Sequence, residues 1–514
     1  MNQNTENMSL KEALVYIKAL KDENERLKQQ NANLTEQIIR NQKKMYGKSS
    51  EQIRYIYDSD QLSFFNEAEQ EYSASAPEPT KETLVAAHTR KAKRTKAEIT
   101  ENLEHKEIIC DLEDKHCPEC GEELVCIGKE FVRSELNIIP AQVFVVDIYR
   151  KVYKCANCAD DEYTPILKAE TPVPVMKKSM ATPATVAYVM QQKYQLGMPL
   201  NRQEQYWKAE GVELSRTILA NWIIRSSMWF EKLWERMHEI LLSEDIIHAD
   251  ETPLRVLKRN GQQVDGQSRM WVFCSGKYSE HKMALYYHHA TRSGKVVEKI
   301  LGDYSKYLQT DGCASYNAAV KAVHIGCWAH ARRKWTDCLP KGIDDKNSKA
   351  AQALELIERI FAADKGLEGM PENDRRTKVL KPLLDKYWKL LETIDAPKGS
   401  GIYKAMLYSV NQKEQLNNVL LDSRIELTNN LAERAIKPFV VGRKNWLFSD
   451  TDKGADASAR CYSIIESAKA NNLNVFGYLT HLLTALPKLR TEPTTEQLDE
   501  LLPWSIVLPD YCHN

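Results

Sequence analysis

Five apolar runs between residues 245 and 330 decide the fold of this chain: DIIHAD (245–250), SRMWVFCSG (268–276), HKMALYYHHA (281–290), KYLQTD (306–311) and VHIGCWAH (323–330). Each run has the length and the β-branched or aromatic content of a strand. Glycines between the first two runs favour a turn, and a short helical pattern separates the third run from the fourth. The order is therefore three antiparallel strands, followed by strands that alternate with helices.

This order is that of the ribonuclease H-like fold, which we expect for the central part of the chain. Residues 339–424 are long, charged and helical in pattern, as in AAQALELIERIFAADKG (350–366). We interpret them as a helical insertion between the fifth strand and a later helix. The expected fold class is multidomain α+β, with a ribonuclease H-like α/β catalytic domain that carries a helical insertion.

Three acidic residues occupy positions that suit metal-assisted chemistry on a phosphodiester. Asp250 and Asp311 end apolar runs, and Glu433 lies among helix formers in LTNNLAERAIKPFVVGRKNWLF (427–448). Two divalent cations about 3.5–4 Å apart, held by a few carboxylates, activate both oxygens of such a reaction. Each residue alone has a simpler interpretation, because an Asp at a strand end often forms a turn or caps a helix.

Length and composition describe an ordinary globular protein of several domains. The 514 residues are 43% hydrophobic and 28% charged, and 71 basic residues balance 71 acidic ones. No apolar run approaches the roughly 18 residues that span a bilayer, and the N-terminus lacks an apolar signal core. We therefore expect a cytoplasmic protein with no membrane partner. Twelve cysteines in such a chain favour thiols or metal sites over a disulfide scaffold.

The first 45 residues carry a heptad pattern. One core position holds Leu20, Leu27 and Leu34, and the other holds isolated asparagines such as Asn24. Leucines with isolated asparagines are typical of a parallel two-stranded coiled coil, which predicts a homodimer or higher oligomer. A single amphipathic helix packed on its own chain is the alternative. Residues 59–96 are rich in Glu, Ala, Ser and Pro and read as a linker that ends in the basic cluster HTRKAKRTK.

Two CxxC pairs predict a zinc-ribbon-like finger with structural Zn²⁺. CPECG supplies Cys117 and Cys120, and CANC supplies Cys155 and Cys158, with strand-like sequence between them. Each pair places two thiolates on one side of a tight turn, and four thiolates suit one tetrahedral zinc ion. The gap between the pairs exceeds the usual spacing, but a long hairpin accommodates it. Redox cysteines or coincidence are the alternatives.

The stretch from Ala181 to Ser227 predicts three helices, divided by turns at Gly197–Pro199 and Gly211. Ser215 is a plausible N-cap of the third helix, which carries Thr217 and Asn221 on its early turns. This is a helix-turn-helix shape, and its last helix could enter a major groove of DNA. A helical packing module without DNA contact fits the pattern equally well.

Basic residues near the expected strand ends and the later helix are candidates for DNA contact, because local basic clusters neutralise phosphates even in a chain of zero net charge. Arg443 and Lys444 lie between Gly442 and Trp446, where we expect a tight turn. Solvated helix faces are the alternative for all of them. The candidates are Arg332, Arg333, Arg434, Lys437, Arg443 and Lys444.

Taken together, these segments resemble the large transposase of the insertion-sequence-sixty-six family, and the resemblance extends over most of the chain. The motifs that carry it are YGKSSE (46–51), the two CxxC pairs, PLNRQEQYW (199–207), LSRTILANW (214–222), HADETPLRVL (248–257), QTDGCASYN (309–317), GCWAHARRKW (326–335), NNLAERAIKPFVVGRKNWLFSDTDKGA (429–455) and LLPW (501–504).

The resemblance implies a DDE transposase. Asp250, Asp311 and Glu433 would then be the catalytic triad and bind two Mg²⁺ (or Mn²⁺) ions. The implied activity is cleavage and strand transfer of DNA at the terminal inverted repeats of a mobile element and at a target. It also implies a bacterial, nucleoid-associated protein, with accessory proteins of the same element as further partners. Two alternatives share these features: a ribonuclease H-like nuclease without strand transfer, and a non-catalytic zinc-finger regulator that binds DNA.

The expected domain boundaries follow from these segments. They are 1–52 for the coiled coil, 53–98 for the linker with its basic cluster, 99–170 for the zinc-binding domain, 171–240 for the helical DNA-binding domain, 241–338 for the first part of the catalytic domain, 339–424 for the helical insertion, 425–480 for the second part of the catalytic domain, and 481–514 for the C-terminal segment.

Overall fold

A computed structural model describes most of the chain from residue 172 onward. The described residues are 18, 20–28, 30, 143–145, 147–149, 152–154, 166–168, 172–264, 266–339, 348–367, 373–489 and 492–514. The chain divides into two compact units, residues 1–45 with 145–514 and residues 46–144, and the fold below belongs to the first. The linker, most of the heptad segment and the four predicted zinc ligands (Cys117, Cys120, Cys155 and Cys158) lie outside the described residues.

The centre of the first unit is a mixed sheet with the order β6-β5-β3-β7-β8. Neighbours among the first three strands are antiparallel, whereas β7 is parallel to both β3 and β8. The order along the chain confirms the predicted succession of strands. The strands are β3 (Ile246–Arg259), β5 (Gln267–Ser275), β6 (Ala284–His289), β7 (Tyr307–Gln309) and β8 (Val323–Ile325).

Two of the predicted strands differ from the structure at their ends. The first does not stop at Asp250, because β3 is 14 residues long and extends to Arg259. Its second half pairs with the short strands β4 (Gln262–Gln263) and β9 (Ser449–Thr451). The strand predicted for residues 323–330 was wrong beyond Ile325. Helix α9 (Trp328–Thr336) begins there, and its buried residues Trp328, Ala331 and Trp335 recur at helical spacing.

The three helices predicted between residues 181 and 227 are confirmed. They are α4 (Pro183–Tyr194), α5 (Leu200–Ala209) and α6 (Arg216–Ser227). Ser215 caps α6 as predicted, since its hydroxyl accepts a hydrogen bond from the backbone N–H of Ile218. Gly197 and Gly211 lie in the turns with φ of +70° and +82°, a conformation that glycine adopts without strain.

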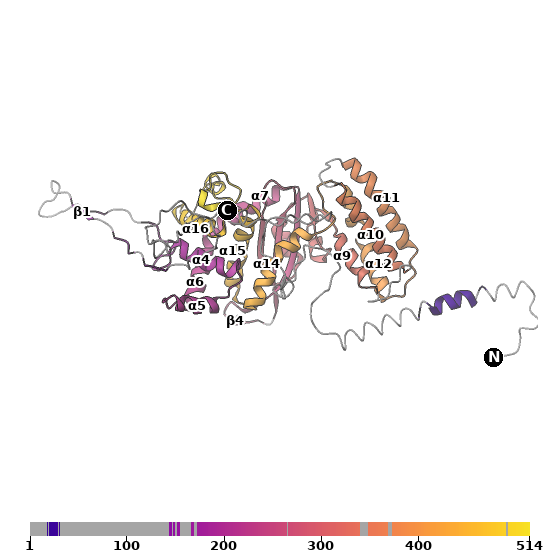
Figure 1. Ribbon diagram of the computed structural model, residues 1–514, viewed down its shortest axis with the longest axis horizontal. Helices are drawn as coiled ribbons and strands as arrows, with labels where there is room; N and C mark the ends of the chain where they lie inside the picture. The colour runs from indigo at the N-terminus through magenta and orange to yellow at the C-terminus, as the bar shows by residue number, and fades with distance from the viewer. Residues whose placement is uncertain are drawn as a thin grey trace, which may run out of the picture. The chain divides into compact units, whose positions relative to one another are not determined.

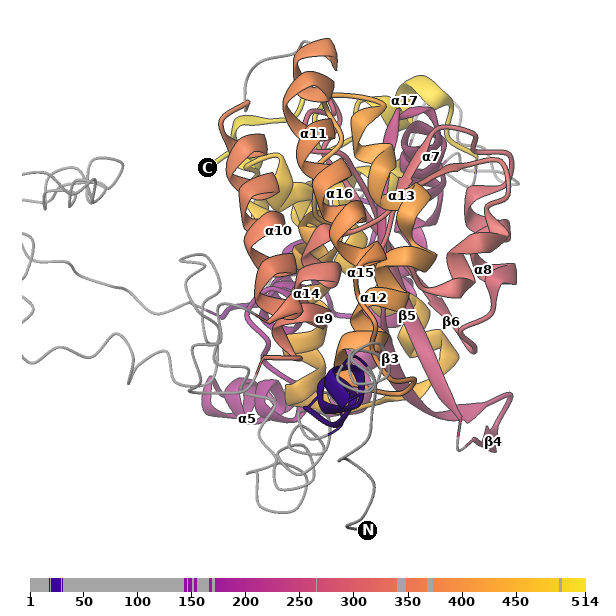
Figure 2. The same ribbon diagram turned by 90° about the vertical axis from the view of Figure 1, so that its right-hand side faces the viewer.

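Helices α14 and α15 pack against the sheet near β3, β5 and β6 (Figure 2). Hydroxyl groups of α15 bond the edge strand β6, because Ser463 and Ser467 accept hydrogen bonds from the backbone N–H of Tyr286 and Ala284. The sheet and these helices share one hydrophobic core. The further helices of this part are α7 (Glu231–Ser243), α8 (Gly294–Leu301), α14 (Asn430–Trp446), α15 (Asp452–Ala470), α16 (Val475–Ala485) and α17 (Thr495–Asp499).

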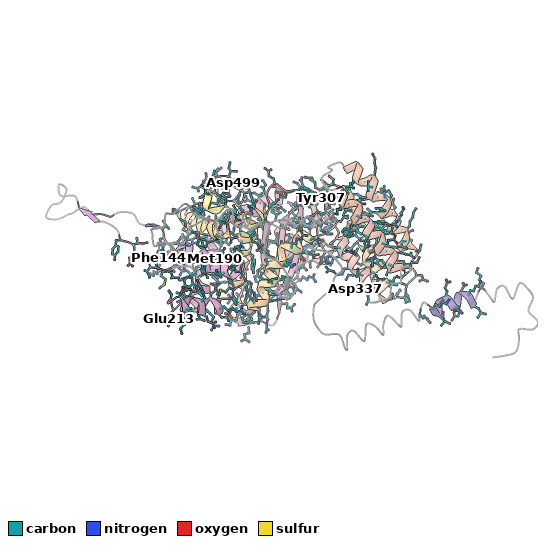
Figure 3. The ribbon with its side chains drawn as sticks, in the orientation of Figure 1. Phe144, Met190, Glu213, Tyr307, Asp337 and Asp499 are labelled. Carbon is teal, nitrogen blue, oxygen red and sulfur yellow. The ribbon has the colours of Figure 1, made fainter. Side chains whose placement is uncertain are left out.

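A second hydrophobic core lies in the segment that we predicted to be a helical insertion. Helices α10 to α13 follow α9, and Figure 1 shows α10, α11 and α12 beside it. Tyr307, labelled in Figure 3, packs against this second core from the start of β7. Within it, the indole N–H of Trp335 donates to the Tyr387 hydroxyl at 2.8 Å. The helices are α10 (Lys349–Lys365), α11 (Asn373–Glu392), α12 (Gly401–Asn411) and α13 (Lys413–Asn417).

The remaining described elements are short. Strands β1 (Val152–Lys154) and β2 (Ile166–Lys168) pair antiparallel, and the CANC motif lies between them in sequence. Residues 18, 20–28 and 30 are helical, in agreement with the helix predicted for the N-terminal segment. Among the residues that the structure describes, no helix is long and apolar enough to cross a membrane.

Candidate active site

The register between β3 and β7 brings Asp250 and Asp311 to one place. His248 pairs with Gln309 at the end of the parallel ladder, and each Asp lies two residues beyond its own strand's member of that pair. Neighbouring strands lie about 4.8 Å apart, and residues two apart share a face of the sheet. The two carboxylates therefore extend from adjacent strands at the same level, as the sequence predicted.

The environment of Asp250 disfavours its negative charge. Its pKa is raised to about 8, mainly by burial and to a smaller extent by the charges of Glu251, Asp311 and Glu433, while a hydrogen bond from the Glu251 backbone N–H to Oδ1 opposes the shift. Like charges at short range favour the neutral form of one partner. The three candidate carboxylates thus interact electrostatically, although one is within β3, one follows β7 and one is on a helix.

Glu433 lies in the first turn of α14, where acidic side chains interact favourably with the helix dipole. Asn429, the N-cap residue of this helix, is completely buried. Its side-chain amide donates to the carbonyl of Ala249 at 2.8 Å, and its Oδ1 lies 3.2 Å from Nδ1 of His248. Both partners are on β3 next to Asp250. Asn429 therefore fixes the start of the Glu433 helix against the strand that carries the first carboxylate.

His248 is buried, and burial lowers its pKa to about 4. The ring is therefore neutral at physiological pH, and its Nδ1–H donates to Asn429 Oδ1. Sequence reasoning left three roles open for this residue: tuning Asp250, contacting DNA or packing. Its burial and its bond to Asn429 support packing, with a direct effect on where α14 begins.

A second acidic residue, Glu251, forms a closed network beside Asp250. Its Oε2 accepts a 2.6 Å hydrogen bond from the Tyr316 hydroxyl, and its Oε1 accepts one of 2.7 Å from Nε of Arg292. The Glu251 side chain is only 3% exposed, whereas that of Arg292 is 47% exposed. The network neutralises Glu251 and leaves part of a guanidinium accessible near Asp311. Sequence reasoning missed all three residues, because none of them stands out before the strands are aligned.

The six basic candidates fall into two groups. Arg332 donates to Glu358 on α10 at 3.2 Å, and Arg443 bonds the Pro253 carbonyl and lies 3.4 Å from the Thr252 hydroxyl. These two side chains link helices to their neighbours. The other four are near the carboxylates or on the surface of α14. Burial lowers the pKa of His330, and the nearby charge of Arg333 lowers it further. The four are Arg333, Arg434, Lys437 and Lys444.

The tight turn predicted at Gly442 was wrong, since Gly442 to Trp446 form the last turn of α14. The physical reason is close packing: a Cβ at Gly442 would collide with the Trp446 ring and the Tyr462 hydroxyl. The Trp446 ring contacts Tyr194 and Tyr462 and lies 4.3 Å from the Lys193 ammonium group. It is therefore packed inside the protein and is not available to stack on a base.

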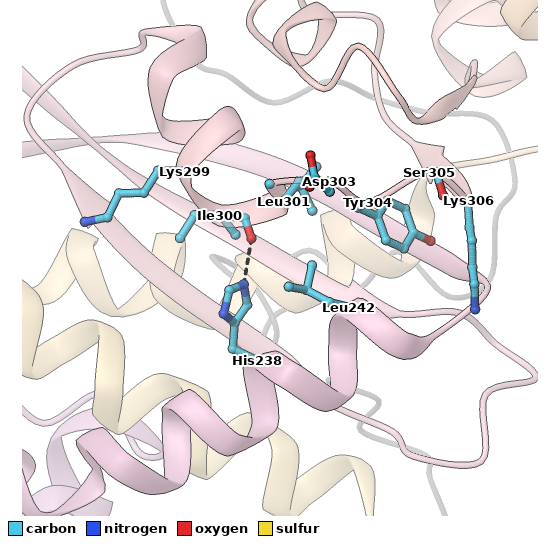
Figure 4. A pocket seen from close by; sticks show the side chains of 10 residues that line it. His238, Leu242, Lys299, Ile300, Leu301, Asp303, Tyr304, Ser305 and Lys306 are labelled. Carbon is cyan, nitrogen blue, oxygen red and sulfur yellow. Dashed lines mark hydrogen bonds between the residues drawn. The ribbon is translucent and has the colours of Figure 1, made fainter.

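A pocket between α7 and α8 lies away from the carboxylates (Figure 4). His238 on α7 bonds the carbonyl of Ile300 at 2.7 Å across it. Residues 304–306, which also line the pocket, precede β7, whereas Asp311 follows that strand. The pocket and the acidic site are thus at opposite ends of β7, and the pocket does not contribute to the site.

Comparison with protein families assigns nearly every part of the chain. Four family models match: "Transposase IS66 family" over residues 178–457, "zinc-finger binding domain of transposase IS66" over 114–159, "IS66 C-terminal element" over 463–504, and "Transposase C of IS166 homeodomain" over 33–108. The first match contains the sheet, the helical segment and all three carboxylates. The second contains both CxxC pairs.

Similar proteins occur in Sinorhizobium fredii. The uncharacterized protein y4qI is 27% identical over 505 residues, which cover 94% of this chain and 90% of the relative. The uncharacterized protein y4jD is 27% identical over 438 residues, covering 79% of this chain and 81% of the relative. No solved structure matches the chain. The main family model covers more than half of the 514 residues, and the chain therefore belongs to the IS66 transposase family.

Proposed function

We propose that this protein is a DNA transposase whose Asp250, Asp311 and Glu433 bind divalent metal ions and carry out DNA cleavage and strand transfer. The observation that carries the proposal is the grouping of these carboxylates: their charges act on one another at the point where β3, β7 and α14 meet. The strand order supports a ribonuclease H-like fold for this part of the chain.

The residues at this point fit a hard divalent cation. Mg²⁺ and Mn²⁺ prefer carboxylate oxygen and water, and the pKa of Asp250 is raised mainly by burial, with a smaller contribution from the charges of Asp311 and Glu433. A pair of bound ions would lower the pKa of an attacking water or 3′ hydroxyl and stabilise the leaving oxygen. The chain's own contribution is to fix the three carboxylates on rigid elements, with Asn429 holding α14 against β3.

Four basic residues would bind the DNA backbone beside the carboxylates: Arg333, Arg434, Lys437 and Lys444. Arg434 and Lys444 are exposed on α14, and Arg333 is on α9 near His330. Cations at these positions compete with solvent counterions for the phosphates, so binding would weaken steeply with salt. The bonds of Arg332 to Glu358 and of Arg443 to Pro253 also give these two residues a part in positioning helices.

Helix α6 would read the ends of the element. Its apolar residues Leu219, Trp222 and Ile223 are buried, whereas Thr217, Asn221 and Arg225 form an exposed row at helical spacing. A polar row on the last helix of a helix-turn-helix is the surface that enters a major groove. The packing of α6 on α4 and α15 orients this row but leaves it accessible.

Assembly and zinc binding complete the proposal. Leu20 and Leu27, which share a predicted core position of the heptad segment, are 51% and 48% exposed. Two such apolar rows would bury each other in a parallel dimer. The zinc-finger family match supports one structural Zn²⁺ on Cys117, Cys120, Cys155 and Cys158.

The test combines cleavage, joining and binding on one set of variants. Asp250→Asn, Asp311→Asn and Glu433→Gln keep the side-chain shape and remove a metal ligand. With DNA that carries the element's own ends, Mg²⁺ and a supercoiled target, each should lose cleavage and strand transfer to background while retaining DNA binding. Asp303→Asn is the matched control and should be fully active, because this carboxylate precedes β7, is 90% exposed and, among the described residues, pairs with Lys321.

The outcomes separate the competing functions. Cleavage without a joined product in the unmodified protein would identify a nuclease. Binding of element ends without cleavage or joining, by the unmodified protein and equally by all three variants, would identify a regulator.

A further inference from the structure

A cluster of mixed ligands lies directly beside the three carboxylates. Sγ of Cys327, a ring nitrogen of His330 and a carboxylate oxygen of Glu433 all lie within 4.8 Å of one another. Cys327 precedes α9 and His330 is in its first turn, while Glu433 is in the first turn of α14. Two helix starts that are about a hundred residues apart in sequence thus place a sulfur, a nitrogen and an oxygen around one point.

Two of the three groups have unsatisfied atoms there. His330 Nδ1 and Glu433 Oε1 are buried, lie 3.7 Å apart, and have no hydrogen-bond partner among the residues that the structure describes. A buried polar atom without a partner costs roughly 1–3 kcal/mol. Nδ1 and Oε1 can both serve as electron-pair donors, so a cation between them would satisfy both at once.

Backbone N–H groups surround the sulfur of Cys327. Its Sγ accepts a 3.2 Å hydrogen bond from the backbone N–H of Asn429, and backbone N–H groups of Ala329 and His330 also lower its pKa. Burial outweighs them and raises the pKa of the thiol to about 11 in the absence of a cation. N–H groups directed at a sulfur stabilise negative charge on it, which is the form that binds a metal ion.

The geometry points to a binding site for a zinc-class divalent cation on Cys327, His330 and Glu433. A thiolate with an imidazole and a carboxylate selects a borderline-soft metal such as Zn²⁺ over Mg²⁺. Tetrahedral zinc, with Zn–S bonds of about 2.3 Å and Zn–N or Zn–O bonds of about 2.0 Å, places its ligand atoms about 3.3–3.6 Å apart. His330 Nδ1 and Glu433 Oε1 are already 3.7 Å apart. Three protein ligands leave the fourth position for water.

This site is distinct from the zinc finger and does not depend on the proposed catalysis. Its ligands lie outside the residues matched by the zinc-finger family model, 114–159. A cation held there would bind one oxygen of Glu433 and leave the other carboxylate oxygen for a second cation. The bound ion would also bridge α9 and α14, the helices that precede and follow the helical segment along the chain.

The test is metal content of the full-length protein after equilibration with Zn²⁺ and removal of free ion. We expect two Zn²⁺ per chain in the unmodified protein, and one in Cys327→Ser or His330→Gln. Cys461→Ser should keep both ions, since this buried cysteine has no ligand partner in the described chain. Equal zinc content in Cys327→Ser and the unmodified protein would overturn the proposal.

A spectroscopic measurement separates the two kinds of site. With Co²⁺ in place of Zn²⁺, a thiolate ligand produces charge-transfer absorption in the near ultraviolet. In a Cys117→Ser background, which disables the finger, the remaining absorption should correspond to one thiolate and disappear on adding Cys327→Ser. Absorption that survives this second substitution would place the second ion elsewhere. Loss of transposition with unchanged metal content would count against this site alone.

Discussion

The burial of Asp250 beside other carboxylates predicts that Asp250→Asn stabilises the metal-free protein, and more so as pH rises. The pKa of Asp250 is about 8 in the folded chain and near 3.8 in a free Asp, so the folded state binds the extra proton between these values. Stability therefore falls as pH rises through this window. Asn cannot titrate, and its Oδ1 can still accept the hydrogen bond from the Glu251 backbone N–H.

The size of this change in stability follows from the free energy of a one-unit pKa shift, about 1.4 kcal/mol. If the whole pKa shift contributes to stability, the unmodified protein is less stable by about 3 kcal/mol at pH 7 than at pH 5. Asp250 retains some contact with solvent, which reduces the effect, and we expect the gap between variant and unmodified protein to grow by about 1–3 kcal/mol. In urea unfolding this is a shift of about 0.5–1.5 M in the difference between midpoints.

The assay is urea unfolding followed by tryptophan fluorescence at pH 5, 6 and 7, in buffer without Mg²⁺. No chelator is added, so that structural zinc stays bound. Saturating Mg²⁺ should remove most of the pH dependence of the unmodified protein, because a bound cation stabilises the Asp250 carboxylate. A difference between the two proteins that is constant from pH 5 to pH 7 would refute the raised pKa of the buried Asp250 carboxyl.

Two further substitutions test how α14 is held. Asn429→Ala removes the buried bonds that join this helix to β3 and should destabilise the protein by about 2–4 kcal/mol in urea. It should also lower DNA cleavage more than DNA binding, whereas purely structural damage would lower both equally. Gly442→Ala puts a methyl group against Trp446 and Tyr462 and should cost about 1–3 kcal/mol; unchanged stability would mean that the end of α14 is loosely packed.

Part of this site could be predicted from sequence because strand geometry is regular. Apolar runs that end in Asp250 and Asp311 were sufficient to place both at one edge of the sheet, and the register of β3 with β7 agrees. The three helices before the sheet were also predictable, since glycine turns and the Ser215 cap mark their ends. These signals are local or depend only on the periodicity of a strand.

The contacts that hold Glu433 were not predictable, because they join residues far apart in sequence. Asn429 looked like one more polar residue before a helix, yet it bonds β3 about 180 residues away. Cys327 read as part of an apolar strand, and only the start of α9 brings it next to His330. Arg443 was a candidate for binding phosphate because it lies in a basic cluster, but its guanidinium bonds the backbone carbonyl of Pro253.

The position of Glu433 depends little on the length of the helical segment that precedes it in the sequence. The segment leaves the sheet after Cys327 and returns at Leu427, and these two points are bonded to each other: the N–H of Trp328 donates to the Leu427 carbonyl at 2.8 Å, and that of Asn429 donates to Cys327 Sγ. Because the ends are closed, and because loop-closure entropy grows only slowly with length, helices can be added between them at little cost to the site. The second hydrophobic core, which also includes Ile246 of β3 and Ile325 of β8, stabilises those helices. The distance in sequence between Asp311 and Glu433 therefore says little about their distance in space, which the few bonds around Asn429 determine.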